Sequence, residues 1–179
     1  VGGICNDDGE LLFYSDENNV YNGCHNVLPN GTGLIGESGR THGTIYSRKG
    51  ADKYYVFTTT QVGAGGLFYS VIDKTLNGGY GDVDINFKND TIMMDNITET
   101  FNVIDHCNGI DFWVATIKSG TNQLYAYLID GTGIQAPVIS TVGPNQGVGN
   151  HGFKFSPNGK KLITSRSAGG GGQTVLYDF

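Results

Sequence analysis

The sequence predicts an all-β protein, and three observations support this fold class. Of the 179 residues 29 are Gly, roughly twice the average share, and Gly permits the positive φ angles of tight turns. Ten Tyr and nine Phe supply aromatic side chains that strands favour. No long window has apolar residues at the helical spacing i, i+3, i+4, i+7 and also lacks Gly and clusters of β-branched residues. Many short strands joined by turns fit this composition.

Short apolar runs mark the expected strands, because each is bounded by Gly, Asn, Asp or Ser. These runs are Leu11–Ser15, Tyr54–Thr60, Leu67–Asp73, Phe112–Ile117, Leu124–Asp130, Lys161–Ser165 and Thr174–Asp178.

A turn-and-strand unit occurs four times along the chain. Each unit has a turn, a polar residue, an apolar strand ending in Ser or Thr, and then a second strand containing Tyr. The turns lie at Gly9, Ala51, Gly109 and Gly159, roughly 40 to 60 residues apart, and propeller blades repeat at roughly 40–50 residues. We therefore expect a β-propeller of about four four-stranded antiparallel blades, with approximate limits 1–40, 41–90, 91–148 and 149–179. Asn-Gly and Asp-Gly turns favour type I′ hairpins within these blades.

Residues 1–179 are expected to form a single propeller segment that is part of a larger propeller. The last unit stops after its third strand, at Phe179, and the first has little room for an innermost strand. Open sheet edges of this kind can pair with another chain. We therefore expect possible self-association through the blade edges.

The charge balance argues against two classes of partner. The chain carries 11 Lys and Arg against 17 Asp and Glu, a net charge of -6, whereas a phosphate backbone requires clustered cations. No stretch approaches the roughly 20 apolar residues of a membrane helix. We expect neither nucleic-acid binding nor membrane insertion.

Three cysteines leave at least one thiol without an internal partner. A bridge between Cys5 and Cys24 is one possibility. The interpretation that we favour is that Cys5, Cys24 and Cys107 are free thiols buried in strands.

Two groups of residues could bind a metal, and each has an ordinary structural explanation. The four histidines are His25, His42, His106 and His151, of which two adjoin a cysteine. Neighbouring residues of a strand point to opposite faces, so one such pair does not readily supply two zinc ligands. The segment Asp82–Asp90 begins like a calcium loop, but Phe87 replaces the required Gly and Met93 the required Glu. We expect this segment to be a strand with one solvated face.

The sequence assigns no catalytic, cofactor or metal residues. Paired carboxylates could hydrolyse glycosides, but Asp16, Glu17, Asp73, Asp105, Asp111 and Asp130 lie mostly at strand ends or turns. No Gly-x-Ser-x-Gly elbow occurs. The aromatic residues Trp113, Tyr125 and Tyr127 could stack on sugars, but packing inside a blade is the favoured role.

A family resemblance extends over nearly the whole chain. Leu11–Asp16, Val20–Asn22 and His25–Leu34 resemble the amino-terminal propeller of large Bacteroidetes surface proteins that carry a type IX secretion sorting domain, some of them similar to gliding-motility adhesins. Tyr54–Thr58, Gly66–Asp73 and Leu76–Val83 extend the resemblance, and Phe153–Leu162 matches a more widespread propeller turn. The chain departs from the family in its length and at Asn22-Gly23-Cys24.

This resemblance implies an extracellular, non-catalytic module in adhesion or protein binding. We therefore expect a scaffold or binding module, secreted or at the cell surface, whose partner is a protein or a glycan and which needs no cofactor. Two alternatives stay open. One is a carbohydrate-active enzyme or glycan-binding propeller, and the other is a structural subunit of a surface assembly or filament.

Overall fold

The computed structural model describes residues 2–16, 18–36, 43–60, 65–94, 97–145, 151–168 and 171–179. Over these residues the protein is all-β, as the sequence predicts, and the only helical turns are the 3₁₀ segments η1 (Asn77–Gly79) and η2 (Ile85–Phe87).

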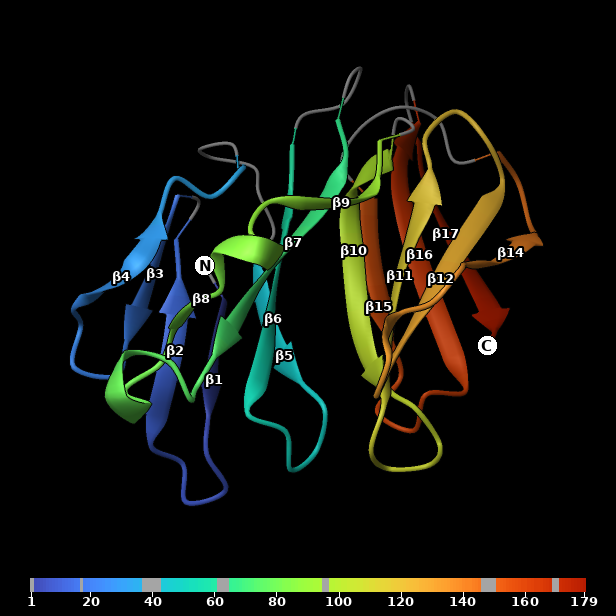
Figure 1. Ribbon diagram of the computed structural model, residues 1–179. Helices are drawn as coiled ribbons and strands as arrows, with labels where there is room; N and C mark the ends of the chain where they lie inside the picture. The colour runs from blue at the N-terminus through green and yellow to red at the C-terminus, as the bar shows by residue number, and fades with distance from the viewer. Residues whose placement is uncertain are drawn as a thin grey trace. The chain divides into compact units, whose positions relative to one another are not determined.

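The strands form four antiparallel sheets, and within each sheet the strands follow one another in chain order (Figure 1). Sheet A holds β1 (Gly2–Cys5), β2 (Leu11–Ser15), β3 (Asn19–Asn22) and β4 (Val27–Thr32). Sheet B holds β5 (Thr44–Ser47), β6 (Lys53–Thr59), β7 (Leu67–Asp73), β8 (Asp82–Val83) and β9 (Asp90–Met93). Sheet C holds β10 (Ile97–Asp105), β11 (Phe112–Lys118), β12 (Gln123–Asp130), β13 (Gly133–Ile134) and β14 (Val138–Thr141). Sheet D holds β15 (His151–Phe155), β16 (Lys161–Ala168) and β17 (Gly171–Asp178).

Sheets B and C share a split outer position. In sheet B both β8 and β9 pair with β7, and in sheet C both β13 and β14 pair with β12. In these two sheets, a pair of short strands therefore occupies the position of a fourth strand. Every apolar run expected to be a strand lies in one, apart from Thr60, which follows the end of β6.

The expected type I′ turns are wrong. That turn requires positive φ at both central residues, but among the described residues only the glycine has it at each of these turns. The φ angles are 83° at Gly9, 72° at Gly50, 68° at Gly109 and 69° at Gly159. The second turn, which the Ala51 N–H closes by donating to the Arg48 carbonyl at 3.1 Å, has its positive φ at Gly50. In the first, third and fourth turns the glycine N–H donates to the carbonyl three residues earlier. These turns are therefore longer loops and not two-residue hairpins.

The single strand expected over Asp82–Asp90 is also wrong, because β8 ends at Val83 and η2 follows. The side chain of Asp84 accepts a hydrogen bond from the Asn86 N–H, which caps η2. Asn89 then has a φ of 61°, outside the extended range of a strand. Alternation of apolar and polar residues was here the pattern of a capped turn.

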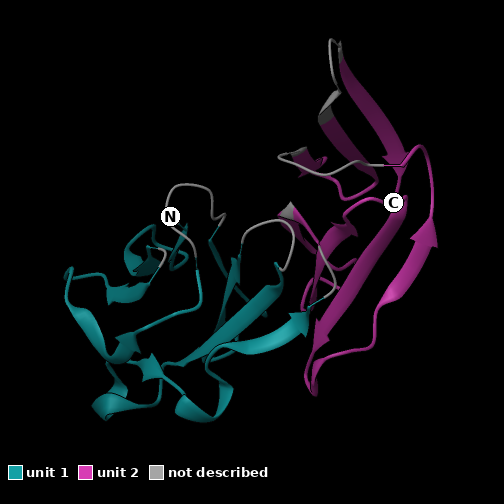
Figure 2. Cartoon of the chain, turned by 90° about the horizontal axis from the view of Figure 1, so that it is seen from above, with its two compact units in different colours: residues 1–61, 65–94 teal, residues 62–64, 95–179 magenta. Residues whose placement is uncertain are grey.

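The chain divides into two compact units (Figure 2). Unit 1 comprises Val1–Gln61 and Gly65–Met94, and unit 2 comprises Val62–Ala64 and Asp95–Phe179. In unit 1, sheets A and B enclose a core of buried side chains, namely Phe13, Val20, Leu28, Leu34, Ile45, Tyr54, Val56, Ile72 and Val83.

In unit 2, sheets C and D enclose the corresponding core. Its buried members are Ala115, Ile117, Leu124, Ala126, Phe153, Phe155 and Leu162, and Ile104, Trp113 and Tyr177 pack against them. Strand β10 lies beside β15. Sheet D thus covers the inner strands of sheet C.

A candidate binding pocket in unit 2

A pocket of about 620 Å³ lies between sheets C and D, a size typical of ligand-binding sites. Its apolar wall comes from sheet C and from Phe179, which follows β17, and its polar rim comes from two turns and from residues of β10, β14 and β17. The lining residues are Ile104, Asp105, His106, Cys107, Trp113, Leu124, Ala126, Val138, Ser140, Val142, Asn158, Gly159, Lys160, Asp178 and Phe179.

Exposure across one row of sheet C locates the opening of the pocket. Ala115, Ala126 and Val138 are successive cross-strand partners on β11, β12 and β14, so they share one face of the sheet. Their exposed fractions are 0%, 6% and 56%. Sheet D therefore covers β11 and β12 but ends before β14.

In unit 1 the outer strand of the first sheet is covered at the corresponding place. Leu28 on the outer strand β4 of sheet A is only 2% exposed, and Val83 on β8 of sheet B is fully buried in the same core. Strand β4 lies against β8. The carboxylate of Asp82 accepts hydrogen bonds from the Asn30 backbone N–H (2.8 Å) and side-chain amide (2.6 Å). An outer strand of sheet B thus covers the outer strand of sheet A.

The third strand of each sheet ends in an Asn or Asp, which is a further feature that the four sheets share. In sheet B the Asp73 carboxylate accepts from the Thr75 N–H and hydroxyl (2.9 and 2.6 Å), and in sheet C Asp130 accepts from Thr132 in the same way (2.7 Å each). The Thr75 hydroxyl bond lowers the pKa of Asp73 despite some desolvation. These turns lead the chain into β8 and β13. Asp178 holds the same position at the end of β17 and forms an ion pair with Lys161.

Aromatic rings form one wall of the pocket. The Trp113 ring lies 5.8 Å from the His106 ring and 6.4 Å from the Phe179 ring, edge to face in the second case. Phe179 in turn meets Phe155 of the core at 4.6 Å. Aromatic pairs of this kind hold a flat apolar surface in place, and aromatic residues are common in binding sites.

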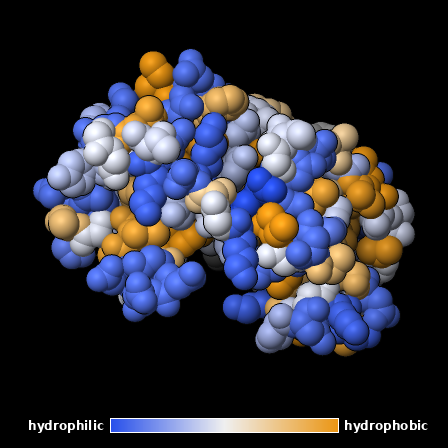
Figure 3. All heavy atoms as spheres, turned by 60° about the horizontal axis from the view of Figure 1, so that its bottom comes forward, coloured by the Kyte–Doolittle hydropathy of each residue, from blue (hydrophilic) through white to orange (hydrophobic). Residues whose placement is uncertain are grey.

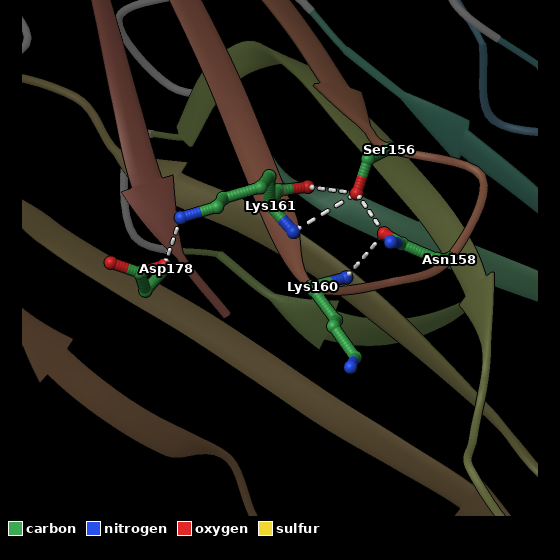
Figure 4. Close-up of polar contacts among 5 residues, drawn as sticks. All are labelled: Ser156, Asn158, Lys160, Lys161 and Asp178. Carbon is green, nitrogen blue, oxygen red and sulfur yellow. Dashed lines mark hydrogen bonds and ion pairs between the residues drawn. The ribbon is translucent and has the colours of Figure 1, made fainter.

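The rim is held by the β15–β16 turn (Figure 4). The Lys161 N–H donates to the Ser156 hydroxyl oxygen at 3.0 Å, and that hydroxyl donates to the Asn158 side-chain oxygen at 2.8 Å. The Lys160 N–H also donates to the Asn158 oxygen, at 3.2 Å. Asn158 and Lys160 line the pocket, so these bonds fix a polar edge beside the apolar wall.

His106 and Cys107 line the pocket side by side. The Cys107 sulfur is 4.0 Å from Nδ1 and 3.9 Å from Nε2 of His106. The Asn108 backbone N–H donates to Nδ1 at 3.2 Å, which places the imidazole in a turn-capping role.

The three cysteines are free, but they are exposed, so the expectation of burial is wrong and so is the possible Cys5–Cys24 bridge. Cys24 and Cys107 lie in turns, and Cys5 ends β1, where a side chain meets solvent.

No group of three His, Cys, Asp or Glu among the described residues is placed to hold a metal ion. In the Asp82–Asp90 segment, Asp82 binds Asn30 as above, and Asn89 bonds the backbone of Ile35 and Gly33. These groups pin segments of unit 1 together. His42 lies outside the described residues, as does Glu17, and the side chain of His151 is not described.

A second polar and aromatic cluster lies on the outer face of sheet A in unit 1. Tyr14 and Tyr21 are cross-strand partners whose rings stack at 4.7 Å and 8°, and His25 Nδ1 lies 3.2 Å from the Tyr14 hydroxyl. Tyr21 donates to Asp16 at 2.7 Å, and Asn19 also bonds this carboxylate. Desolvation opposes ionisation of Asp16, but the hydrogen bonds from Tyr21, Asn18 and Asn19 outweigh it and lower its pKa.

The aromatic residues chosen from the sequence divide between core and pocket. Tyr127 is buried, and this burial raises its pKa to about 12. Tyr125 is half-buried, and Trp113 packs on the core while lining the pocket. Sequence reasoning missed Val138 and Phe179. No local pattern in the sequence signalled them, because they come together through contacts between segments that are distant in the chain.

The chain matches no family model, no curated protein and no solved structure. Within the described residues, no helix has the length and apolar character to cross a membrane.

Exposed apolar side chains are interspersed with hydrophilic ones over the face in Figure 3.

Proposed function

We propose that the chain is part of a β-propeller, with sheets A to D as successive blades within residues 1–40, 41–90, 91–148 and 149–179. The support is the repetition of one antiparallel meander four times in chain order, with the face of one sheet buried against the next in each unit. Blades cannot bury both faces alone, so stacking of this kind is what propeller blades need.

The module serves as a non-catalytic scaffold or binding module of a secreted or cell-surface bacterial protein, as the resemblance implies. The observation that carries a binding role is the unit 2 pocket, whose wall is apolar and aromatic and whose rim is polar. Such pockets bind through a buried apolar contact and take specificity from the rim.

The test is a screen of the purified chain against a displayed peptide library and a glycan array. Ligands of the pocket should bind Val138→Asp at least tenfold more weakly than they bind the unaltered chain. They should bind Ile139→Asp with unchanged affinity. These neighbours on β14 are 56% and 51% exposed and lie on opposite faces. Equal effects of the two variants would contradict a ligand site in the pocket.

Glycan binding at the outer face of sheet A is a second candidate, favoured by the half-buried Tyr14–Tyr21 stack. Flat aromatic rings beside Asp16 and Asn19 offer both stacking and hydrogen bonds to a sugar. On the glycan array, Tyr21→Ala should abolish binding while Tyr80→Ala, at an exposed tyrosine elsewhere in unit 1, should not. Retained binding by Tyr21→Ala would remove this candidate.

A further inference from the structure

We infer that Asn77 is a site of spontaneous covalent modification, at which the side-chain amide is lost and aspartate or β-linked isoaspartate is formed. The inference is independent of the binding function proposed above. It is drawn from the five Asn-Gly pairs of the chain, which share one local sequence and differ in their surroundings. These pairs begin at Asn22, Asn30, Asn77, Asn108 and Asn158.

The reaction joins the backbone nitrogen of the glycine to the side chain of the asparagine before it. Once hydroxide has removed its proton, the Gly78 nitrogen attacks Cγ of Asn77. The bond between Cγ and Nδ2 then breaks, and ammonia leaves with a proton from water, which restores the hydroxide. Water opens the resulting succinimide ring at one of its two carbonyls and yields aspartate or isoaspartate at position 77. Asparagine is thermolabile, and a following glycine permits the close approach of backbone that the ring requires.

Both reacting groups are available at Asn77. This residue lies in the exposed turn η1, and its side chain has no hydrogen bond to any described residue. The Gly79 N–H donates to the Leu76 carbonyl at 3.1 Å, but no described carbonyl accepts from the N–H of Gly78. A Cβ placed on Gly78 would meet no atom within 4 Å beyond its chain neighbours. The surroundings therefore leave room for the ring and give water access to it.

In the third and fourth turns of the repeat, both reacting groups are held by hydrogen bonds. The N–H groups of Gly109 and Gly159 each donate at 2.9 Å to the carbonyl three residues earlier. The Asn108 amide donates to Asp111 Oδ2 at 2.6 Å, and the Asn158 oxygen accepts the two bonds of the β15–β16 turn described above. Because each of these bonds must break before the nitrogen can attack, we expect slow reaction at both pairs.

In the remaining two pairs, the side chain is bonded and the glycine is crowded. The Asn22 oxygen accepts from the backbone N–H groups of Cys24 and Asn26 at 3.0 Å each. The Asn30 amide donates to the Asp82 carboxylate at 2.6 Å. A Cβ on the following glycine would lie 2.1 Å from a backbone oxygen in the first pair and 2.7 Å from one in the second. The structure therefore singles out Asn77 among five pairs of the same sequence.

The test is incubation of the purified chain at mildly alkaline pH, with conversion at each pair followed by peptide mapping and mass spectrometry. The expected rate at Asn77 is at least tenfold higher than at each of the other four pairs. In the chain unfolded in urea, the five rates should differ only a few-fold, because the pairs then differ only in their neighbouring residues.

Two variants serve as matched controls. Asn77→Gly keeps the turn, since glycine accepts the φ of 54° found there, and it should lose the acidic species that isoelectric focusing resolves on ageing. Asn108→Gly should still form that species. Far-UV circular dichroism establishes that both variants are folded.

Three results would overturn the inference. One is a rate at Asn77 that does not exceed the rates of the other pairs in the folded chain. Another is a tenfold lead of Asn77 that persists in urea, because local sequence and not the fold would then select the site. The third is an acidic species that still forms at the original rate in Asn77→Gly, since the modified residue would then lie elsewhere.

Discussion

Two valines on outer strands, one in each unit, give a quantitative test of how the units differ. Val83 on β8 is fully buried and Val138 on β14 is 56% exposed. Val83→Ala removes about 1.6 kcal/mol of transfer free energy at ~0.8 kcal/mol per methylene-sized group. A cavity term brings the expected loss of unfolding free energy to about 2–3 kcal/mol. Val138→Ala forfeits less than half of the transfer term, about 0.7 kcal/mol, and leaves no cavity.

The assay is urea unfolding, followed by far-UV circular dichroism for the whole chain and by Trp113 fluorescence for unit 2. The unfolding midpoint should fall clearly for Val83→Ala and barely for Val138→Ala, with unchanged urea dependence. The reasoning is refuted if the two variants lose equal stability, because Val138 would then be covered in solution. It also fails if Val83→Ala loses less than about 0.5 kcal/mol, the range of surface substitutions.

Three further predictions concern unit 1 and share the urea assay. Asp82→Asn should lose about 1–3 kcal/mol, because the amide cannot accept both bonds from Asn30 as a carboxylate does, and an unchanged midpoint would contradict this. Gly31→Ala should lose about 1–3 kcal/mol, because a Cβ would lie 2.7 Å from the Val20 carbonyl oxygen, and a neutral result would show that β4 can move. The pKa of Asp73 is lower in the folded chain than its unfolded value of about 3.9. The ionised carboxylate therefore stabilises the fold at pH values above about 3.9, and this stabilisation is lost as the pH falls through the folded pKa. The deficit of Asp73→Asn should therefore be full at pH 7 and shrink below about pH 4, and a deficit independent of pH would argue against it.

Local pattern was sufficient where a strand is continuous and apolar. Leu67–Asp73 matches β7 residue for residue, because apolar residues, mostly aromatic or β-branched and interrupted only by Ser70, lie between turn residues. The same reasoning failed over Asp82–Asp90, since the capping bond of Asp84 competes with extended backbone there. Alternation alone does not distinguish a half-buried strand from a capped turn.

The pocket could not be predicted because it depends on pairing between distant segments. Val138 and Ile139 place apolar side chains on both faces of β14, and Val142 follows the strand, so the sequence does not say which face is covered. Their exposure follows from the extent of sheet D, which begins beyond them in the chain. The exposed cysteines show the same limit, since burial is set by tertiary contacts and not by residue type.

The most direct test of the central claim is whether ligands selected from the library bind at the unit 2 pocket. The account predicts that their binding changes the fluorescence of Trp113, which lines the pocket, and that their affinity falls at least tenfold in Val138→Asp while it is unchanged in Ile139→Asp. Equal affinities of the two variants would contradict a ligand site in the pocket.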